Sequence, residues 1–330
     1  MSVTRRSFIG TAGAVLAVGP AAATAPDYDA ARAYSEARRG VSLLVRQGGR
    51  TLFESYVHGP DRAYELASGT KSFCGVMAAA LAQDGLLRLD EPCADTLAEW
   101  RDDPAKRRVT VRMLLTLTGG VGGGPVGRPP AYAEAVAAPL ASEPGARFEY
   151  GPNPFQVFGE IVRRKLAAAG RGDDVYAWMT ERLLGPIGIA PGFWRRREGQ
   201  PVLPSGAGLT AADWARFGEF VLADGRGLVD PAALAACFQG TALNPGYGLT
   251  WWLLRPGLVE PGRRSGLAED ARAIGARADV RMAAGAGQQR LYLIPARDLV
   301  IVRQATGILD RTPAEAREWS DRAFLDLLLA

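Results

Sequence analysis

Two pairs of β-rich segments stand near opposite ends of the chain, and mostly helical patterns lie between them. Residues 41–45 and 51–56 enclose a Gly-Gly turn, and residues 291–294 and 299–304 enclose a turn that contains proline. Each pair is typical of an antiparallel hairpin. This order predicts a mixed α/β (α+β) fold, in which one antiparallel sheet is built from the N- and C-terminal segments and flanked by helices. An all-helical lobe is expected as an insertion, over roughly residues 90–240.

The longest helical pattern begins at Ser68. Its apolar side chains recur with the spacing i, i+3, i+4, i+7 and i+8 and stop before Gly85, which predicts a core helix over residues 68–83. The Gly- and Pro-rich stretch Gly119–Pro130 predicts a surface loop. Further helices are expected over residues 111–117, 155–168, 174–184, 211–223 and 312–329.

The first residues have the pattern of an export signal. Arg5 and Arg6 precede a short apolar run and a cluster of small residues, which resembles a twin-arginine signal peptide over residues 1–25. A disordered basic start and an uncleaved anchor are the alternatives. We expect export to the periplasm or the extracellular space, with residues 26–330 as the exported domain. The apolar run is too short for a permanent helix across a bilayer, and no later stretch is long and apolar enough, so no stable membrane span is expected.

Charge and cysteine spacing argue against several kinds of partner. The formal net charge of +4 falls to about +2 without Arg5 and Arg6, which is too small to favour a nucleic-acid partner. The three cysteines show no Cys-x-x-Cys or Cys/His spacing and the chain has one histidine, so we expect no metal site. No organic cofactor is implied.

The pattern Ser68-Gly-Thr-Lys71, at the start of the core helix, carries the chemistry. Residues three apart lie on one helical face, so the Lys71 amine is expected beside the Ser68 hydroxyl. Backbone N–H groups at a helix N-terminus favour developing negative charge, and a buried lysine with a lowered pKa accepts a serine proton. The bare pattern also fits a serine that only caps the helix. The single histidine, His58, lies in a loop, which counts against a Ser-His-Asp triad.

Around this pattern the chain resembles the serine β-lactamase and penicillin-recognising superfamily, over roughly residues 40–306. The branch that it resembles holds class C β-lactamases, D-alanyl-D-alanine carboxypeptidases and ester or linear-amide hydrolases. Besides Ser-x-x-Lys, the resemblance rests on residues 84–92, 109–120 and Phe148-Glu-Tyr150-Gly-Pro-Asn153, the last being similar to the family's Tyr-x-Asn element. It implies the β-lactamase/transpeptidase-like fold, with Ser68 as the acylated nucleophile and with Lys71 and Tyr150 sharing the base and proton-relay work.

The third family element is usually Lys-Thr-Gly or His-x-Gly. The matching segment of this chain consists of Gly285, Ala286, Gly287 and Gln288. It brings no cation or hydroxyl, but small residues let the backbone approach a substrate. The resemblance implies an oxyanion hole made by the N–H group of Ser68 and one N–H group of Ala286 or Gln288, whereas a plain glycine turn is the structural alternative. Asn153 is a further substrate-binding candidate, although it stands one place later than the family's asparagine because Pro152 occupies that position.

The resemblance implies acyl transfer to water from a small-molecule ester, amide or peptide-like substrate. Because the third element lacks a cation for a substrate carboxylate, an ester or linear amide is favoured, with Trp251 or Trp252 as an apolar wall. One alternative is a β-lactamase or D-alanyl-D-alanine carboxypeptidase, in which Arg290 replaces the missing cation. The other alternative is a catalytically inactive binding protein of the same fold.

Overall fold

The computed structural model describes residues 25–122, 124, 127–261, 265–307 and 319–329. The expected signal peptide therefore lies outside the described residues except for Ala25, and so do residues 312–318 of the expected closing helix. Among the described residues, no helix is both long and apolar enough to cross a membrane.

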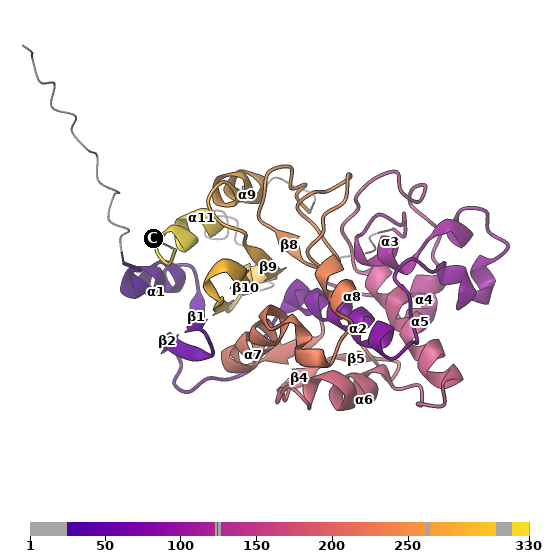
Figure 1. The fold of residues 1–330 in the computed structure, drawn as a ribbon, viewed down its shortest axis with the longest axis horizontal. Helices are drawn as coiled ribbons and strands as arrows, with labels where there is room; N and C mark the ends of the chain where they lie inside the picture. The colour runs from indigo at the N-terminus through magenta and orange to yellow at the C-terminus, as the bar shows by residue number, and fades with distance from the viewer. Residues whose placement is uncertain (1–24, 123, 125–126, 262–264, 308–318, 330) are drawn as a thin grey trace, which may run out of the picture.

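A six-stranded antiparallel sheet forms the centre of one half of the molecule (Figure 1). Its order is β2-β1-β11-β10-β9-β8, so strands from the two ends of the chain pair at the β1–β11 contact. Both expected hairpins are present and the expected fold class is confirmed. The strands are β1 Gly40–Gln47, β2 Arg50–Tyr56, β8 Trp252–Leu253, β9 Arg281–Gly285, β10 Gln289–Ile294 and β11 Leu299–Ala305.

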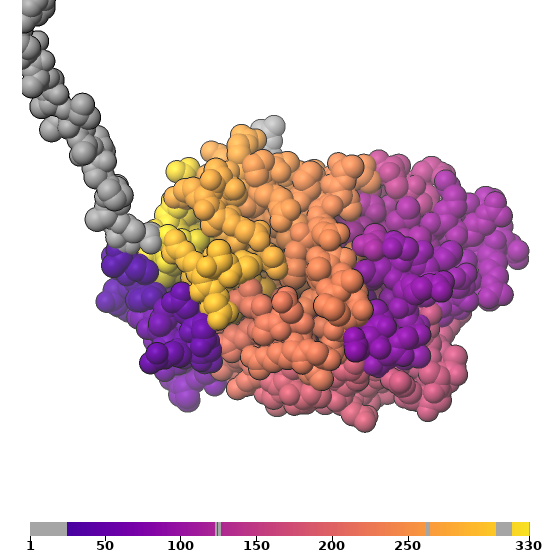
Figure 2. Space-filling model, in the orientation of Figure 1, coloured from indigo at the N-terminus to yellow at the C-terminus, as the bar shows by residue number. Residues whose placement is uncertain are grey.

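Helices cover the two faces of this sheet. Helix α7, Ala211–Leu222, packs on one face of the sheet. Gly218 lies against Leu291 and Val300, and a residue with a side chain would not fit between the helix and the sheet at this position. On the other face, Arg290 and Arg303 extend toward the helices at the chain termini. Figure 2 shows the N-terminal and C-terminal segments side by side at one end of the molecule. The helices on this side are α1 Tyr28–Glu36, α9 Leu267–Gly275 and α11 Asp321–Asp326.

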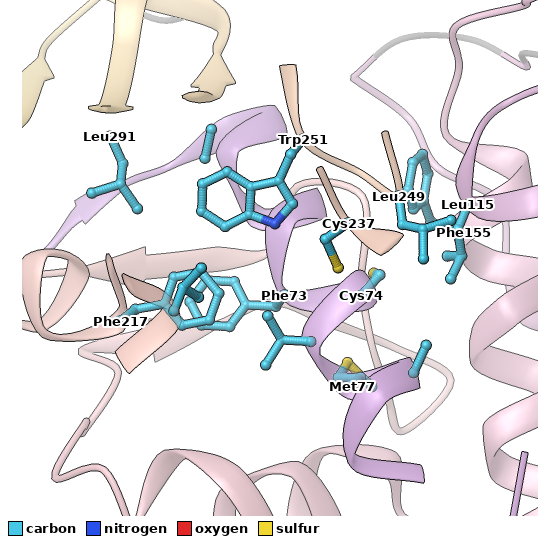
Figure 3. Close-up of a cluster of buried hydrophobic side chains, with 14 of the residues drawn as sticks. Phe73, Cys74, Met77, Leu115, Phe155, Phe217, Cys237, Leu249, Trp251 and Leu291 are labelled. Atoms are coloured by element: carbon cyan, nitrogen blue, oxygen red, sulfur yellow. The ribbon is translucent and has the colours of Figure 1, made fainter. Parts of the chain in front are cut away.

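The buried helix α2, Ser72–Gln83, joins the sheet region to the rest of the fold. Its residues Phe73 and Met77 lie in a dense apolar cluster, in which Phe73 stacks on Phe217 at 4.0 Å and Phe217 on Trp251 at 6.1 Å between ring centroids (Figure 3). Because nearly every α2 side chain is buried, this helix holds whatever precedes it rigidly. The remaining helices are α3 Val111–Leu115, α4 Tyr132–Ala137, α5 Asn153–Ala168, α6 Val175–Met179 and α8 Pro231–Ala236.

Short helical turns complete the main chain. Thr180–Leu184 is a π-helical turn that continues α6. The 3₁₀ turns are Ala67–Lys71, Cys93–Asp95, Ala98–Trp100, Lys106–Arg108, Asp224–Gly227, Ala286–Gln288 and Pro295–Arg297.

Three expectations need correction. The inserted lobe is not all-helical, because its segment after α6 pairs locally as short strands: β4 Phe193–Trp194 and β7 Ala207–Leu209 form a sheet with β3 Tyr64–Glu65, and β5 Arg196–Arg197 pairs with β6 Gln200–Pro201. The stretch Gly119–Pro130 is not wholly a surface loop, since Gly119–Val121 is buried. In the described part of the closing segment only α11 is helical, because the Ser320 side chain caps it and fixes its start.

Candidate active site

Ser68 lies in the 3₁₀ turn Ala67–Lys71, and the α-helix itself begins only at Ser72, which corrects the expected helix start. Ala67 has a φ of 47°, in the left-handed region that side chains other than glycine rarely adopt. The turn is fixed at its start, because the Leu66 N–H group donates to the Ala207 carbonyl oxygen at 2.9 Å. Ser68 is partly exposed, whereas its neighbours in the turn are buried. A partly exposed hydroxyl is therefore presented on a rigid, strained support.

Lys71 is the partner that the spacing predicts. Its side chain is 4% exposed, and its Nζ donates hydrogen bonds of 2.9 Å each to Ser68 Oγ and to the carbonyl oxygen of Pro204. Burial lowers the pKa of Lys71 to about 7, because desolvation disfavours the ammonium form. A large neutral fraction is thus present near neutral pH, and a neutral amine in this position is able to accept the serine proton.

Tyr150 lies beside both Ser68 and Lys71. Its half-buried ring stacks on Trp252 with 5.6 Å between centroids, and Lys71 Nζ lies 5.0 Å from the ring centroid. Burial raises the pKa of Tyr150 to about 12, opposed by a hydrogen bond with the Ser68 side chain and by the charge of Arg290. Tyr150 is therefore a neutral phenol at physiological pH, which suits a hydroxyl that passes protons on and does not suit a phenolate base.

The segment Gly285–Gln288 lies beside the serine turn. Gly285 ends β9, and a Cβ atom added there would lie 2.1 Å from the Leu66 carbonyl oxygen and 3.1 Å from the Gly69 nitrogen. Only glycine allows this approach. The next three residues form the 3₁₀ turn Ala286–Gln288 between β9 and β10, so the start of this segment packs against the turn that contains Ser68.

Comparison with known proteins identifies the family. The beta-lactamase family model matches residues 25–322. The chain belongs to the beta-lactamase family. No curated protein matches the chain. Membership of this family supports a serine hydrolase in general terms.

Solved structures confirm the β-lactamase/transpeptidase-like fold. A class C beta-lactamase from Rhodobacter sphaeroides is 21% identical with a TM-score of 0.64, over 91% of this chain and 97% of that chain. A D-stereospecific amidohydrolase from Streptomyces sp. is 19% identical with a TM-score of 0.63, over 84% and 94%. An octameric penicillin-binding protein homologue from Pyrococcus abyssi is 17% identical with a TM-score of 0.63, over 86% and 74%. At these identities the likeness establishes the fold and leaves the substrate open.

Asn153 is the remaining side chain that the sequence assigns to the site. It is buried at the start of α5 beside Gly124, and its Oδ1 has no hydrogen-bond partner among the described residues. In the described structure, the side chain of Asn153 makes no hydrogen bond with Ser68 or Lys71. The second acceptor for Lys71 is instead the carbonyl of Pro204, which sequence reasoning missed because a backbone oxygen from a distant segment has no residue signature.

The two tryptophans have different environments in this family member. Trp251 is fully buried between Phe217 and Phe238, so it belongs to the core. Trp252 is 4% exposed and supports the ring of Tyr150. Both indoles are buried, so Trp252 contributes to the site by supporting the partly exposed ring of Tyr150 and neither indole forms an exposed wall by itself.

Arg290, the expected substitute cation, is buried on the sheet face toward α11. It is 7% exposed, and its guanidinium donates to Asp321, with 2.7 Å between Nε and Oδ1. Within the described residues, no group of three or more His, Cys, Asp and Glu side chains is placed to hold a metal ion. The cysteines Cys74, Cys93 and Cys237 are buried and unbridged, and burial raises the pKa of each thiol.

Proposed function

We propose that this chain is an exported serine hydrolase that cleaves an ester or a linear amide through an acyl-enzyme on Ser68. The observation that carries the proposal is the 2.9 Å hydrogen bond between Lys71 Nζ and Ser68 Oγ. A serine is a weak nucleophile until a neighbouring group takes its proton. A buried lysine whose pKa is lowered to about 7 is such a group.

The acylation step assigns one role to each side chain. Ser68 Oγ attacks the substrate carbonyl carbon while its proton passes to neutral Lys71. The tetrahedral intermediate then loses the alcohol or amine, which takes a proton from Lys71 through the Tyr150 hydroxyl. In the second half a water molecule attacks the acyl carbon and gives its proton to the same pair. The bond from the acyl carbon to Ser68 Oγ then breaks, the pair returns the proton to Oγ, and the acid leaves.

Backbone N–H groups stabilise the negative oxygen of the intermediate in this proposal. One is the N–H group of Ser68, and the second is that of Ala286 or Gln288 in the turn beside it. Fixed donors of this kind contribute strongly, since removal of one costs roughly a hundred- to a thousand-fold in turnover.

The environment of Arg290 supports an ester or linear amide as the substrate class. A β-lactam or a D-amino-acid peptide carries a carboxylate that a cation commonly holds. Arg290 is buried, and its donors are directed at Asp321, Gln288 and two backbone carbonyls, so it is not available to a substrate. A missing charge-assisted hydrogen bond weakens binding by about 1.5–3 kcal/mol. A short ester or linear amide needs only the oxyanion donors and an apolar surface such as the Tyr150 ring, which Trp252 supports.

A side-by-side assay tests the substrate class. We expect p-nitrophenyl acetate or butyrate to be hydrolysed, and a chromogenic cephalosporin and a D-alanyl-D-alanine peptide to be turned over weakly or not at all. A cephalosporin rate well above the ester rate would establish a β-lactamase instead. Ser68→Ala protein is the control, because background hydrolysis by surface groups survives in it. Absence of turnover and of labelling by a fluorophosphonate would establish an inactive binding protein of the same fold.

Export is the second part of the proposal. Arg5 and Arg6, with the apolar run that follows them, support delivery to the periplasm or the extracellular space through the twin-arginine route. The three buried cysteines are compatible with either compartment, because burial limits their oxidation. The expected partner is a small-molecule ester, amide or peptide-like substrate.

A further inference from the structure

We propose that Arg303, with Arg290 beside it, is a positioning residue that holds the turn Ala286–Gln288 in the orientation needed for the oxyanion hole. This inference rests on the proposed function and adds residues that neither touch the substrate nor belong to the serine–lysine pair. Its basis is a set of hydrogen bonds from two buried guanidinium groups to the backbone of that turn and of the residues that flank it.

Arg303, on β11, forms hydrogen bonds with the backbone of the turn. Its side chain is completely buried, and its Nη1 donates to the carbonyl oxygens of Gly287 at 3.1 Å and Gln288 at 2.8 Å. Its remaining donors bind α1, where Nε donates to Ser35 Oγ at 3.1 Å and Nη2 donates to the carbonyls of Ser35 and Arg38. The guanidinium plane also lies over Trp319, 4.5 Å from the ring centroid. One side chain thus joins the turn to the N-terminal helix.

Arg290 forms hydrogen bonds with the residues at the two ends of segment 285–289. It stands opposite Arg303 on the neighbouring strand, so both side chains lie on one face of the sheet. Its Nη1 donates to the carbonyl oxygens of Gly285 at 3.3 Å and Gln289 at 3.1 Å, and its Nη2 donates to Gln288 Oε1 at 2.6 Å. Asp321 neutralises Arg290 and fixes its direction through Nε. Together the two arginines bind four carbonyl oxygens of residues 285–289.

Peptide geometry converts these contacts into an orientation of the N–H groups. In a planar trans peptide the C=O and N–H bonds point in opposite directions. Arg290 holds the Gly285 carbonyl, so the N–H group of Ala286 points away from the arginines. Arg303 holds the Gly287 carbonyl, so the N–H group of Gln288 also points away. Ala286 and Gln288 are the two residues proposed to supply the second oxyanion donor.

The turn needs such support because its backbone is strained. Gly287 has a φ of 72° and Gln288 a φ of 64°, and the latter is unfavourable for a residue with a side chain. Burial of Arg303 is also costly, since desolvation and the nearby Arg290 lower its pKa to about 9. Neutral oxygens accept each of its described hydrogen bonds. A leucine or methionine would fill such a core position at lower cost, which points to a role in positioning.

The test compares Arg303→Met and Arg303→Lys with Ser35→Ala in the full-length protein. Ser35→Ala removes an Arg303 partner on α1 but leaves the contacts with the turn, so it is the matched control. With p-nitrophenyl butyrate, we expect Arg303→Met to lower kcat about 10- to 100-fold with KM changed less than about 2-fold, because the lost interaction acts in the transition state. The kcat of Arg303→Lys should lie between those of Arg303→Met and the parent, since one ammonium group reaches fewer carbonyl oxygens. The kcat of Ser35→Ala should match that of the parent.

A second measurement does not depend on turnover. Amide hydrogen exchange followed by mass spectrometry should be faster at residues 285–289 in Arg303→Met and Arg303→Lys than in Ser35→Ala, with exchange in α2 unchanged. Equal exchange and equal kcat in Arg303→Lys and the parent would overturn the inference, even if Arg303→Met fails to fold. An inactive parent would overturn the proposed function and, with it, the role of Arg303 in catalysis. An active parent whose Arg303 variants keep the parental kcat and the parental exchange at residues 285–289 would overturn only the positioning role.

Discussion

Lys71 Nζ lies 2.9 Å from the carbonyl oxygen of Pro204, on a segment that precedes β7 in the inserted lobe. This acceptor and the Ser68 hydroxyl, which is the other partner, are both uncharged. A carboxylate in either place would hold the ammonium form and raise the pKa of Lys71. Neutral oxygens orient the amine without stabilising its charge, which leaves burial as the dominant influence and keeps the pKa of Lys71 low, at about 7.

The pH dependence of hydrolysis follows from this arrangement. Only neutral Lys71 accepts the Ser68 proton, so kcat/KM should rise with pH through a single midpoint near about 7 and then level off. Tyr150, whose pKa burial raises to about 12, stays neutral over this range and adds no second midpoint below about pH 9. A profile of kcat/KM from about pH 5 to pH 9 measures this. A flat profile, or a midpoint near that of an ordinary carboxylate, would contradict the assignment of Lys71 as the base.

Replacement of Lys71 should raise the stability of the fold, although it abolishes activity. Folding buries an ammonium group, and this cost is fully present below the folded pKa of about 7 and disappears as the pH rises to the unfolded value of 10.5. Lys71→Met should therefore be inactive but more stable, with a larger gain at about pH 6 than at about pH 9. Urea unfolding at both pH values measures the difference. A loss of stability at both would show that the hydrogen bonds of Lys71 outweigh its desolvation.

The hydroxyl of Tyr150 should be needed for catalysis, whereas the hydroxyl of Tyr247 should not. Both rings belong to one aromatic cluster with Trp252, but Tyr247 is fully buried and its hydroxyl has no hydrogen-bond partner among the described residues. We expect Tyr150→Phe to lower kcat by about a hundred-fold or more, as loss of a proton relay does. Tyr247→Phe serves as the matched control with near-parental kcat. Equal effects in the two variants would mean that the cluster acts only by packing.

The sequence predicts most of the framework because its signals are local. The spacing from Ser68 to Lys71 sets both residues on one helical face, and the two hairpins follow from short β-rich runs around turn residues. Strand β9 escaped prediction because Arg281–Gly285 is short and rich in alanine and glycine, with none of the branched or aromatic residues that mark strands. The strands β4–β7 escaped because each has only two or three residues, too few to show an alternating pattern.

The parts of the site that the sequence could not predict depend on distant contacts. The carbonyl of Pro204 reaches Lys71 across 133 positions, and any residue would offer the same oxygen. The sequence predicts that residues 285–288 approach a substrate through their backbone and supply an oxyanion N–H group, but it does not show what holds them. The two arginines that hold it stand on β10 and β11 and became visible only once the pairing of Arg290 with Arg303 and the packing of α1 and α11 were known.

We expect export to depend on the paired arginines Arg5 and Arg6. Replacement of Arg5 and Arg6 by lysine keeps the charge but removes the pattern that the export receptor reads. We expect the variant to accumulate in the cytoplasm, as measured by immunoblotting of cell fractions, while the parent protein reaches the periplasm or the medium. Unchanged export of the variant would show that another route carries the protein.

Covalent labelling of Ser68 shows directly whether this serine is the nucleophile. The purified protein is treated with a fluorophosphonate, whose phosphorus is attacked by the activated serine oxygen with loss of fluoride, and the labelled peptide is identified by mass spectrometry. The matched control is Ser72→Ala, which removes a buried hydroxyl one turn away that donates to the Gly69 carbonyl. We expect one label, on Ser68, that is absent in Ser68→Ala and retained in Ser72→Ala. A label on another residue, or equal labelling of Ser68→Ala and the parent, would contradict it.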